Sequence, residues 1–143
     1  YCQALKDRGI EVDPGLILPC DTPEKVLLLK DQIIGIAPQI DGVFAVNDLT
    51  AIALMQVIQD HGFSIPGQIA VAGFGDDSVA SIIRPRLTTV EQKGYEMGKI
   101  AIEMLLERLE NPGETILARK RVFPANLKVR QSTLSDQYVS LHV

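Results

Sequence analysis

Two polar clusters follow apolar runs at positions where side chains could contact a ligand. The run VFAV ends in Asn47-Asp48, and the run VAGF ends in Gly75 followed by Asp76-Asp77. An amide carries donors and an acceptor, whereas a carboxylate only accepts, so these groups together suit a ligand rich in hydroxyl or amide N–H groups. Simpler roles stay open, because Asn and Asp are also preferred at helix N-termini and in turns.

Motifs for catalysis are missing from the sequence. There is no GxGxxG after a strand and no GxxxxGK[ST], HExxH or GxSxG pattern. His61 falls at a predicted helix end, His142 falls in the tail, and Ser78 and Ser81 lack a nearby base. The two cysteines match no metal or redox spacing. We therefore expect no enzymatic activity, no metal and no cofactor.

Apolar runs alternate with helical patterns along the chain. Short runs of apolar or β-branched residues predict strands at 16–19, 42–46, 69–74, 87–90, 115–117 and 126–130. Apolar residues at helical spacing, bounded by capping residues and stops, predict helices at 1–8, 23–34, 49–60 and 94–110. Continuously apolar strands that alternate with helices are typical of an α/β fold: a parallel sheet with helices on both faces.

The two polar clusters should lie close together in such a sheet. Successive βα units bring the carboxyl ends of their strands to the same edge, where open parallel sheets bind ligands. The sequence therefore predicts a ligand site at this edge. Asn47 and Asp76 are its candidate contacts, and Asp48 is the candidate cap of the helix that follows.

The composition describes one globular domain. Of 143 residues, 46% are hydrophobic and 22% are charged, which is enough apolar material for a real core. A net charge of -4 argues against nucleic-acid binding by this chain alone. No apolar run reaches the roughly 20 residues of a membrane helix. We expect Cys2 and Cys20 to be free thiols, and Arg119-Lys120-Arg121 to be solvated surface.

Several motifs, in their order, resemble the effector domain of LacI/GalR-type transcriptional regulators. The stretch 41–92 contains an apolar strand into ND, then G…IP..IAV.GF, an acidic loop and P.LTTV.Q. The opening YCQALKDRGIEVDP and the closing ANLKVRQST also resemble parts of this family, so the likeness covers residues 1–133. The pattern LTTV.Q together with ND at this spacing is its most specific part.

The resemblance implies the periplasmic-binding-protein type I fold, in which two α/β subdomains close on a small ligand. Residues 1–87 and 115–133 would then belong to the C-terminal subdomain. Residues 88–114 would form a crossover and a helix of the N-terminal subdomain, and 134–143 would be an irregular tail. Because the chain also begins inside a helical pattern, we expect most of the N-terminal subdomain and a DNA-binding helix-turn-helix to be missing from it.

The resemblance also implies roles for single residues. Asn47 matches a ligand-contacting Asn, and Asp48 matches its more structural partner. Asp21 and Gln92 match positions near the ligand, although aromatic residues that often accompany them are absent here. These departures predict a site with polar groups but without an aromatic face.

One further departure affects the acidic loop. The family pattern GFDD is GFGDD in this chain, so the position of the first Asp is held by Gly75. Either Asp76 replaces that ligand contact from one position further on, or the contact is lost.

The function implied by the resemblance is the effector-binding and dimerisation part of a cytoplasmic LacI-type repressor. Its effector would be a sugar, a sugar derivative or a nucleobase-like molecule, and DNA would be bound only through the helix-turn-helix. The resemblance also implies that the protein forms a homodimer, and we expect it not to bind a membrane. A periplasmic sugar-binding protein of a transporter, which shares the fold, is the alternative.

Overall fold

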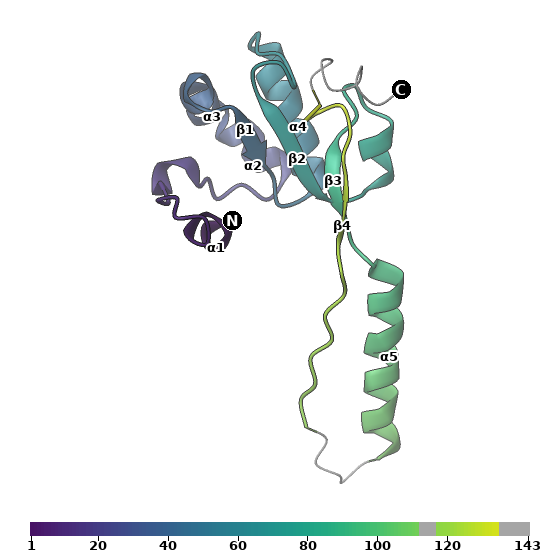
Figure 1. Cartoon of the computed structure of the whole chain (residues 1–143). Coiled ribbons are helices and arrows are strands. Elements are labelled where there is room, and N and C mark those ends of the chain that lie inside the picture. Colours follow the sequence, from purple (N-terminus) through teal and green to yellow (C-terminus); the bar gives the residue numbers. More distant parts are fainter. Residues whose placement is uncertain (112–116, 135–143) are drawn as a thin grey trace.

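The computed structural model describes residues 1–111 and 117–134, and Figure 1 shows a compact body from which one long helix projects. The body contains a four-stranded sheet in the order β1-β2-β3-β4. Its strands are β1 (Gly42–Phe44), β2 (Ala70–Gly75), β3 (Thr88–Glu91) and β4 (Asn126–Lys128). The strands β1, β2 and β3 are parallel, as predicted, but β4 is antiparallel to β3. The sheet is therefore mixed, because the chain leaves β3 toward the projecting helix and must return from that side.

Five α-helices accompany the strands in the described residues. They are α1 (Cys2–Lys6), α2 (Pro23–Leu28), α3 (Lys30–Ile36), α4 (Asp48–Asp60) and α5 (Gly94–Glu110), with 3-10 turns at Pro14–Leu16, Ala37–Gln39 and Ser78–Ser81. The predictions for α4 and α5 are confirmed to within one residue. His61 is the C-cap residue of α4, also as predicted, and its ring nitrogen lies 2.8 Å from the carbonyl oxygen of Val57.

Other predicted elements differ from the structure. The strand expected at 16–19 is wrong: its residues are a 3-10 turn and an extended segment with no ladder partner among the described residues. The helix expected at 23–34 is divided at Leu29, whose backbone leaves helical geometry. Within the expected strand 115–117, the first two residues lie outside the described part and Leu117 belongs to no strand.

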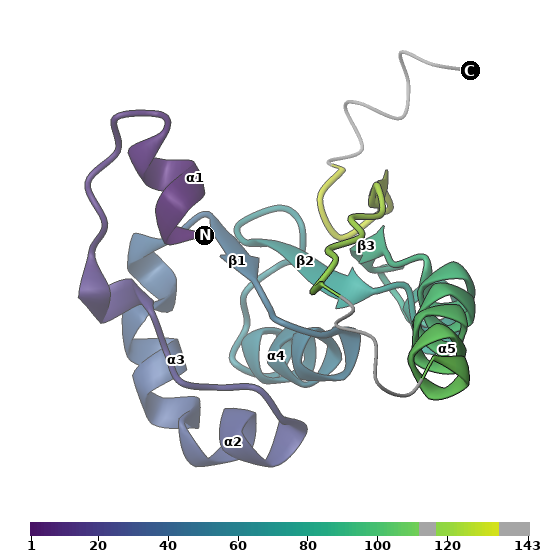
Figure 2. The same ribbon diagram turned by 90° about the horizontal axis from the view of Figure 1, so that it is seen from below.

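The core lies between the sheet and α4. Figure 2 shows α4 along one side of the sheet, α2 beyond it, and α1 toward the opposite side near β1. Apolar residues of α4 and β2 are fully buried there, including Ala51, Met55, Ile58 and Val71. This packing fixes the N-terminus of α4 against the carboxyl ends of β1 and β2.

The segment after β4 is attached to the sheet by Ser132. Its hydroxyl donates to the carbonyl of Val71 at 2.5 Å and accepts the N–H of Thr88 at 2.8 Å. Its own N–H donates to the carbonyl of Arg86, and its carbonyl accepts the N–H of Val71. Ser132 thus joins the chain around β2 and β3 through four hydrogen bonds and is itself fully buried.

The projecting arm consists of α5 and the returning segment 117–125 (Figure 1). An ion pair between Arg119 and Glu107 joins these two parts. Large apolar side chains of α5 are exposed, among them Tyr95, Ile102, Leu105 and Leu109. None of the helices in the described part of the chain is both long and apolar enough to span a membrane.

Candidate functional site

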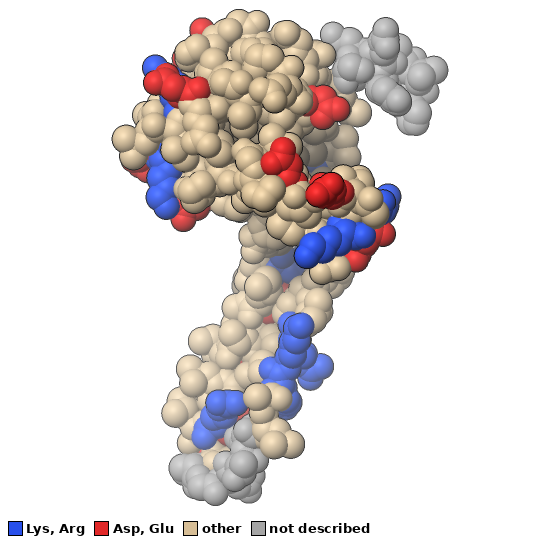
Figure 3. All heavy atoms as spheres, turned by 90° about the vertical axis from the view of Figure 1, so that its left-hand side faces the viewer, with Lys and Arg blue, Asp and Glu red and all other residues tan. Residues whose placement is uncertain are grey.

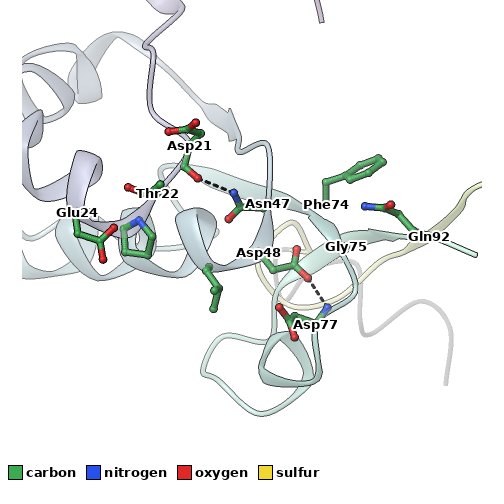
Figure 4. A pocket seen from close by; sticks show the side chains of 11 residues that line it. Asp21, Thr22, Glu24, Asn47, Asp48, Phe74, Gly75, Asp77 and Gln92 are labelled. Atoms are coloured by element: carbon green, nitrogen blue, oxygen red, sulfur yellow. Dashed lines mark hydrogen bonds between the residues drawn. The ribbon is translucent and has the colours of Figure 1, made fainter. Parts of the chain in front are cut away.

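An open hollow of about 480 Å³ lies at the carboxyl ends of the parallel strands. Its walls come from the start of α2, the start of α4, the end of β2 and the residue that follows β3, as Figure 4 shows. The lining residues are Asp21, Thr22, Pro23, Glu24, Asn47, Asp48, Leu49, Phe74, Gly75, Asp77 and Gln92. Three of the four predicted ligand contacts, Asn47, Asp21 and Gln92, are thus brought together on one hollow.

Asn47 is the N-cap of α4 and holds the edge of the hollow together. Its side-chain oxygen accepts the N–H of Thr50 at 2.8 Å, and its side-chain N–H donates to the carbonyl of Asp21 at 2.8 Å. An amide has a second N–H and a second lone pair on its oxygen, and these stay available. Capping and ligand contact are therefore compatible at this residue, and the contact remains a prediction.

Asp48 does not cap α4, which corrects its predicted role, because the capping hydrogen bond comes from Asn47. Instead, its buried carboxylate connects three elements. One oxygen accepts the hydroxyl of Thr89 on β3 at 2.5 Å, and the other accepts the N–H of Asp77 at 2.7 Å. Its position in the first turn of α4 places the negative charge at the favourable end of the helix dipole.

The acidic loop turns Asp76 away from the hollow. Gly75 and Asp76 both have positive φ, 138° and 57°, and the resulting turn directs the carboxylate of Asp76 to Arg130 at 2.6 Å. Asp76 is not among the residues that line the hollow, whereas Asp77 is. The expectation that Asp76 replaces the family's first Asp is therefore not supported, and of the two neighbouring acids Asp77 is the one on the wall.

Asp21 contributes its backbone more than its carboxylate. Its carbonyl holds Asn47, while its exposed carboxylate pairs with Lys25 at 2.6 Å. The hydrogen bond from Lys25 lowers the pKa of Asp21, and the positive charge of Lys25 lowers it further. The negative charge of Asp21 is thus already compensated before any ligand arrives.

An aromatic side chain that the sequence interpretation did not use also lines the hollow. Phe74 is half-buried at the end of β2, and Figure 4 shows its ring beside the amide of Gln92. Buried and partly exposed residues alternate along β2, so Phe74 lies on the opposite side from Val71 and Gly73. That period of two was the signal that could have placed Phe74 outside the core. The expected lack of an aromatic face is thus wrong.

Glu91 lies where the chain leaves β3 toward the arm and where β4 returns from it. Its carboxylate accepts the side-chain N–H of Asn126 at 3.1 Å and lies 3.4 Å from Nζ of Lys128 and 3.8 Å from Nζ of Lys93. The hydrogen bond from Asn126 is the main cause that lowers the pKa of Glu91, followed by the hydrogen bond from Lys128. The ionised carboxylate therefore joins the two crossings between body and arm.

This arrangement predicts a pH dependence. Because the pKa of Glu91 is lower in the folded than in the unfolded chain, its contribution to stability is present above the ordinary pKa of about 4.5 and is lost as the pH falls through the folded pKa. We expect wild type to be more stable than Glu91→Gln at pH 7, and the difference to shrink progressively as the pH falls below about 4.5. Urea unfolding of both proteins across this range tests it. A difference that is constant with pH would contradict the role of the charge.

Comparison with known proteins supports the class indicated by this geometry. Residues 3–133 match the family model of the periplasmic binding protein-like domain. The HTH-type transcriptional repressor PurR of Vibrio atlanticus is 36% identical over 127 residues, which cover 86% of this chain and 36% of that protein. The HTH-type transcriptional regulator CelR of Thermobifida fusca is 32% identical over 133 residues, covering 92% of this chain and 38% of CelR.

Solved structures give the same result. A LacI-family transcriptional regulator from Sanguibacter keddieii matches with a TM-score of 0.83 at 31% identity, covering 93% of this chain and 50% of that one. A complex of the regulator CelR with cellobiose matches with a TM-score of 0.83 at 32% identity, covering 92% and 40%. The chain belongs to the periplasmic binding protein-like family, and its relatives are LacI-type regulators, which confirms the resemblance. It spans less than two fifths of the length of the PurR and CelR proteins.

Proposed function

We propose that this chain is the effector-binding part of a LacI-type transcriptional repressor. The observation that carries the proposal is the hollow at the strand ends, where Asn47 and Gln92 present amide groups beside the ring of Phe74. Amides that can donate and accept, next to an aromatic face, suit a small hydroxylated molecule such as a sugar or a nucleoside-like compound. The effector acts by binding, and no catalytic step is assigned to the site.

The division into two subdomains is also part of the proposal. We place the boundaries where the chain enters and leaves the arm, so that residues 1–91 and 126–133 form the C-terminal subdomain and 92–125 form a crossover and a helix of the N-terminal one. The expected boundaries at 87 and 115 shift, because Thr88–Glu91 pairs with β2 in the body and Arg119 pairs with Glu107 of α5. The projection of α5 away from the body and the exposure of its apolar side chains support this division, because a partner subdomain would cover them. The hollow then faces the cleft between the subdomains.

In this mechanism the effector shifts a population of closure states. A ligand that contacts both subdomains favours the closed arrangement by as much as its affinity differs between open and closed forms. In a cytoplasmic homodimer, the change in closure alters how paired DNA-binding segments outside this chain meet an operator. This chain alone, with its net charge of -4, is expected not to bind DNA at physiological salt.

The variant Asn47→Ala tests the site. Loss of the cap should cost about 1 kcal/mol of stability. The ligand contact should be lost as well, so a compound that raises the melting temperature of the wild type should no longer do so. Thermal-shift measurements with ribose, cellobiose, adenosine and hypoxanthine on both proteins provide the comparison.

Asn111→Ala is the matched control for this experiment. Asn111 also bonds at a helix end, donating to the carbonyl of Glu107 at 2.8 Å, but it lies at the far end of α5. It should leave the ligand-induced shift intact. An unchanged shift in Asn47→Ala would show that the ligand binds elsewhere.

A further inference from the structure

The hollow is lined by acidic side chains and, among the described residues, by no Lys or Arg. The acids come from three elements: Asp21 and Glu24 at the start of α2, Asp48 at the start of α4, and Asp77 after β2. Figure 3 shows several acidic side chains on the body just above the point where the arm leaves, and basic side chains along the arm. The wall of the hollow therefore carries negative charge, which should favour neutral or positively charged ligands.

The four carboxylates are not equally compensated. Asp21 is paired with Lys25, as described above. In the part of the chain that the structure describes, no Lys or Arg nitrogen lies within 4.0 Å of the carboxylates of Glu24, Asp48 or Asp77. Both oxygens of Asp48 are already engaged by Thr89 and the N–H of Asp77.

Asp77 has a backbone that is held in place and an exposed carboxylate that a ligand can reach. Its backbone N–H is held by Asp48 at 2.7 Å, and this bond sets the position of the residue on the wall. Its side chain is exposed and, although Asp77 precedes the 3-10 turn Ser78–Ser81, it makes no capping hydrogen bond there. The neighbouring Asp76, by contrast, is paired with Arg130 outside the hollow.

A negative wall of this kind discriminates among ligands by charge. Repulsion between like charges grows as a ligand leaves bulk water and enters a partly enclosed site. Carboxylate and amide oxygens accept hydrogen bonds from hydroxyl or ammonium groups, and the face of an aromatic ring such as Phe74 attracts a cation. A phosphate or carboxylate on the ligand can still accept from the amide N–H groups of Asn47 and Gln92, but it gains neither of these interactions and meets the negative charge of Asp77.

We propose that the hollow selects a hydroxylated ligand that is neutral or carries an amine, and rejects its phosphorylated or acidic analogues, with Asp77 as the main determinant. This inference rests on the proposed function, since it specifies the effector class of the same site. It restricts that class by charge, which the fold itself does not do.

The test compares related compounds that differ in charge, using the full-length protein. The pairs are ribose with ribose 5-phosphate and cellobiose with cellobionic acid, and the third series is glucosamine and glucose with glucose 6-phosphate. Isothermal titration calorimetry at low salt should show binding in at least one series, with the anionic member at least tenfold weaker than the neutral or amine-bearing one. In Asp77→Asn this ratio should fall at least threefold, because the anionic member no longer meets the negative charge of Asp77.

Asp31→Asn is the matched control, because it removes the same charge from an exposed position in the first turn of α3, outside the hollow. It should leave the ratio unchanged. Equal or tighter binding of the anionic member, or an unchanged ratio in Asp77→Asn, would overturn the charge selection and leave the effector proposal standing. If no member of any series binds, the hydroxylated effector class fails, and this inference fails with it.

Discussion

Substitution of Gly73 by alanine is expected to destabilise the protein by about 3 kcal/mol, as overpacking of a tight core does. Gly73 is buried in β2, and atoms of both Asp48 and Leu87 lie close to the position that its Cβ atom would take. A Cβ atom there would overlap Oδ1 of Asp48 and would lie 3.0 Å from Cδ2 of Leu87 and 3.3 Å from Cα of Asp48. The carboxylate of Asp48 could rotate away only by giving up its hydrogen bonds with Thr89 and Asp77, and the backbone at the start of α4 would also have to shift by a few tenths of an ångström.

The effect should extend to the hollow. The oxygen that the new methyl group displaces accepts the hydroxyl of Thr89, and its companion holds the N–H of Asp77. Urea unfolding should show a lower midpoint at an unchanged slope, as expected for a loss of stability without a change in the surface exposed. A loss below about 1 kcal/mol would mean that the start of α4 moves easily, against the tight packing seen here.

Gly98→Ala is the matched control for this experiment. Gly98 lies within α5, and a Cβ atom there would meet nothing within 4 Å. Alanine in a helix is favoured over glycine by about 0.5–1 kcal/mol, so this variant should be as stable as the wild type or slightly more stable. The contrast separates the loss of backbone freedom, common to both changes, from the steric overlap at Gly73.

The sequence predicted the elements that depend on local pattern. The helices α4 and α5 follow from apolar spacing and clear stops, and β1, β2 and β3 follow from short apolar runs next to helices. The expected strand at 16–19 has the same local pattern, but a strand exists only where a neighbouring strand completes its hydrogen bonds. No such neighbour is present among the described residues, and composition alone cannot show that.

Roles within the site were harder to predict, since they depend on pairs far apart in the chain. Asn47 and Asp48 are both good capping residues. The sequence could not show that the carboxylate of Asp48 would instead accept hydrogen bonds from Thr89 and Asp77. The turn at Gly75 likewise puts Asp77 rather than Asp76 on the wall of the hollow, because consecutive positive φ values direct the carboxylate of Asp76 toward Arg130. The sequence located the edge of the sheet, and only long-range contacts decided which side chains face the hollow.

Asp48→Ala should be as damaging as the change at Gly73, with a loss of about 3 kcal/mol. Thr89 is fully buried, and without the carboxylate its hydroxyl loses its acceptor. The partly buried N–H of Asp77 loses its acceptor as well. A fully buried group left unsatisfied costs about 1–3 kcal/mol, and a partly buried one costs less. Water that enters from the hollow can form hydrogen bonds with these two groups in place of the carboxylate. The total loss of stability should therefore lie near the lower end of the range for two unsatisfied groups.

Two further variants make the measurement at Asp48 decisive. Asp48→Asn keeps an oxygen for the N–H of Asp77 and offers an N–H to Thr89, so it should lose only about 1 kcal/mol, the size of one ordinary hydrogen bond. Asp60→Ala removes an acid from the exposed, opposite end of the same helix, where a negative charge is unfavourable, and should change stability by less than about 0.5 kcal/mol. The order Asp60→Ala, Asp48→Asn, Asp48→Ala in increasing loss is the expected outcome of urea unfolding. If Asp48→Ala were no worse than Asp60→Ala, the buried carboxylate would not hold α4, β3 and the loop of Asp77 together, and the wall of the hollow would need another explanation.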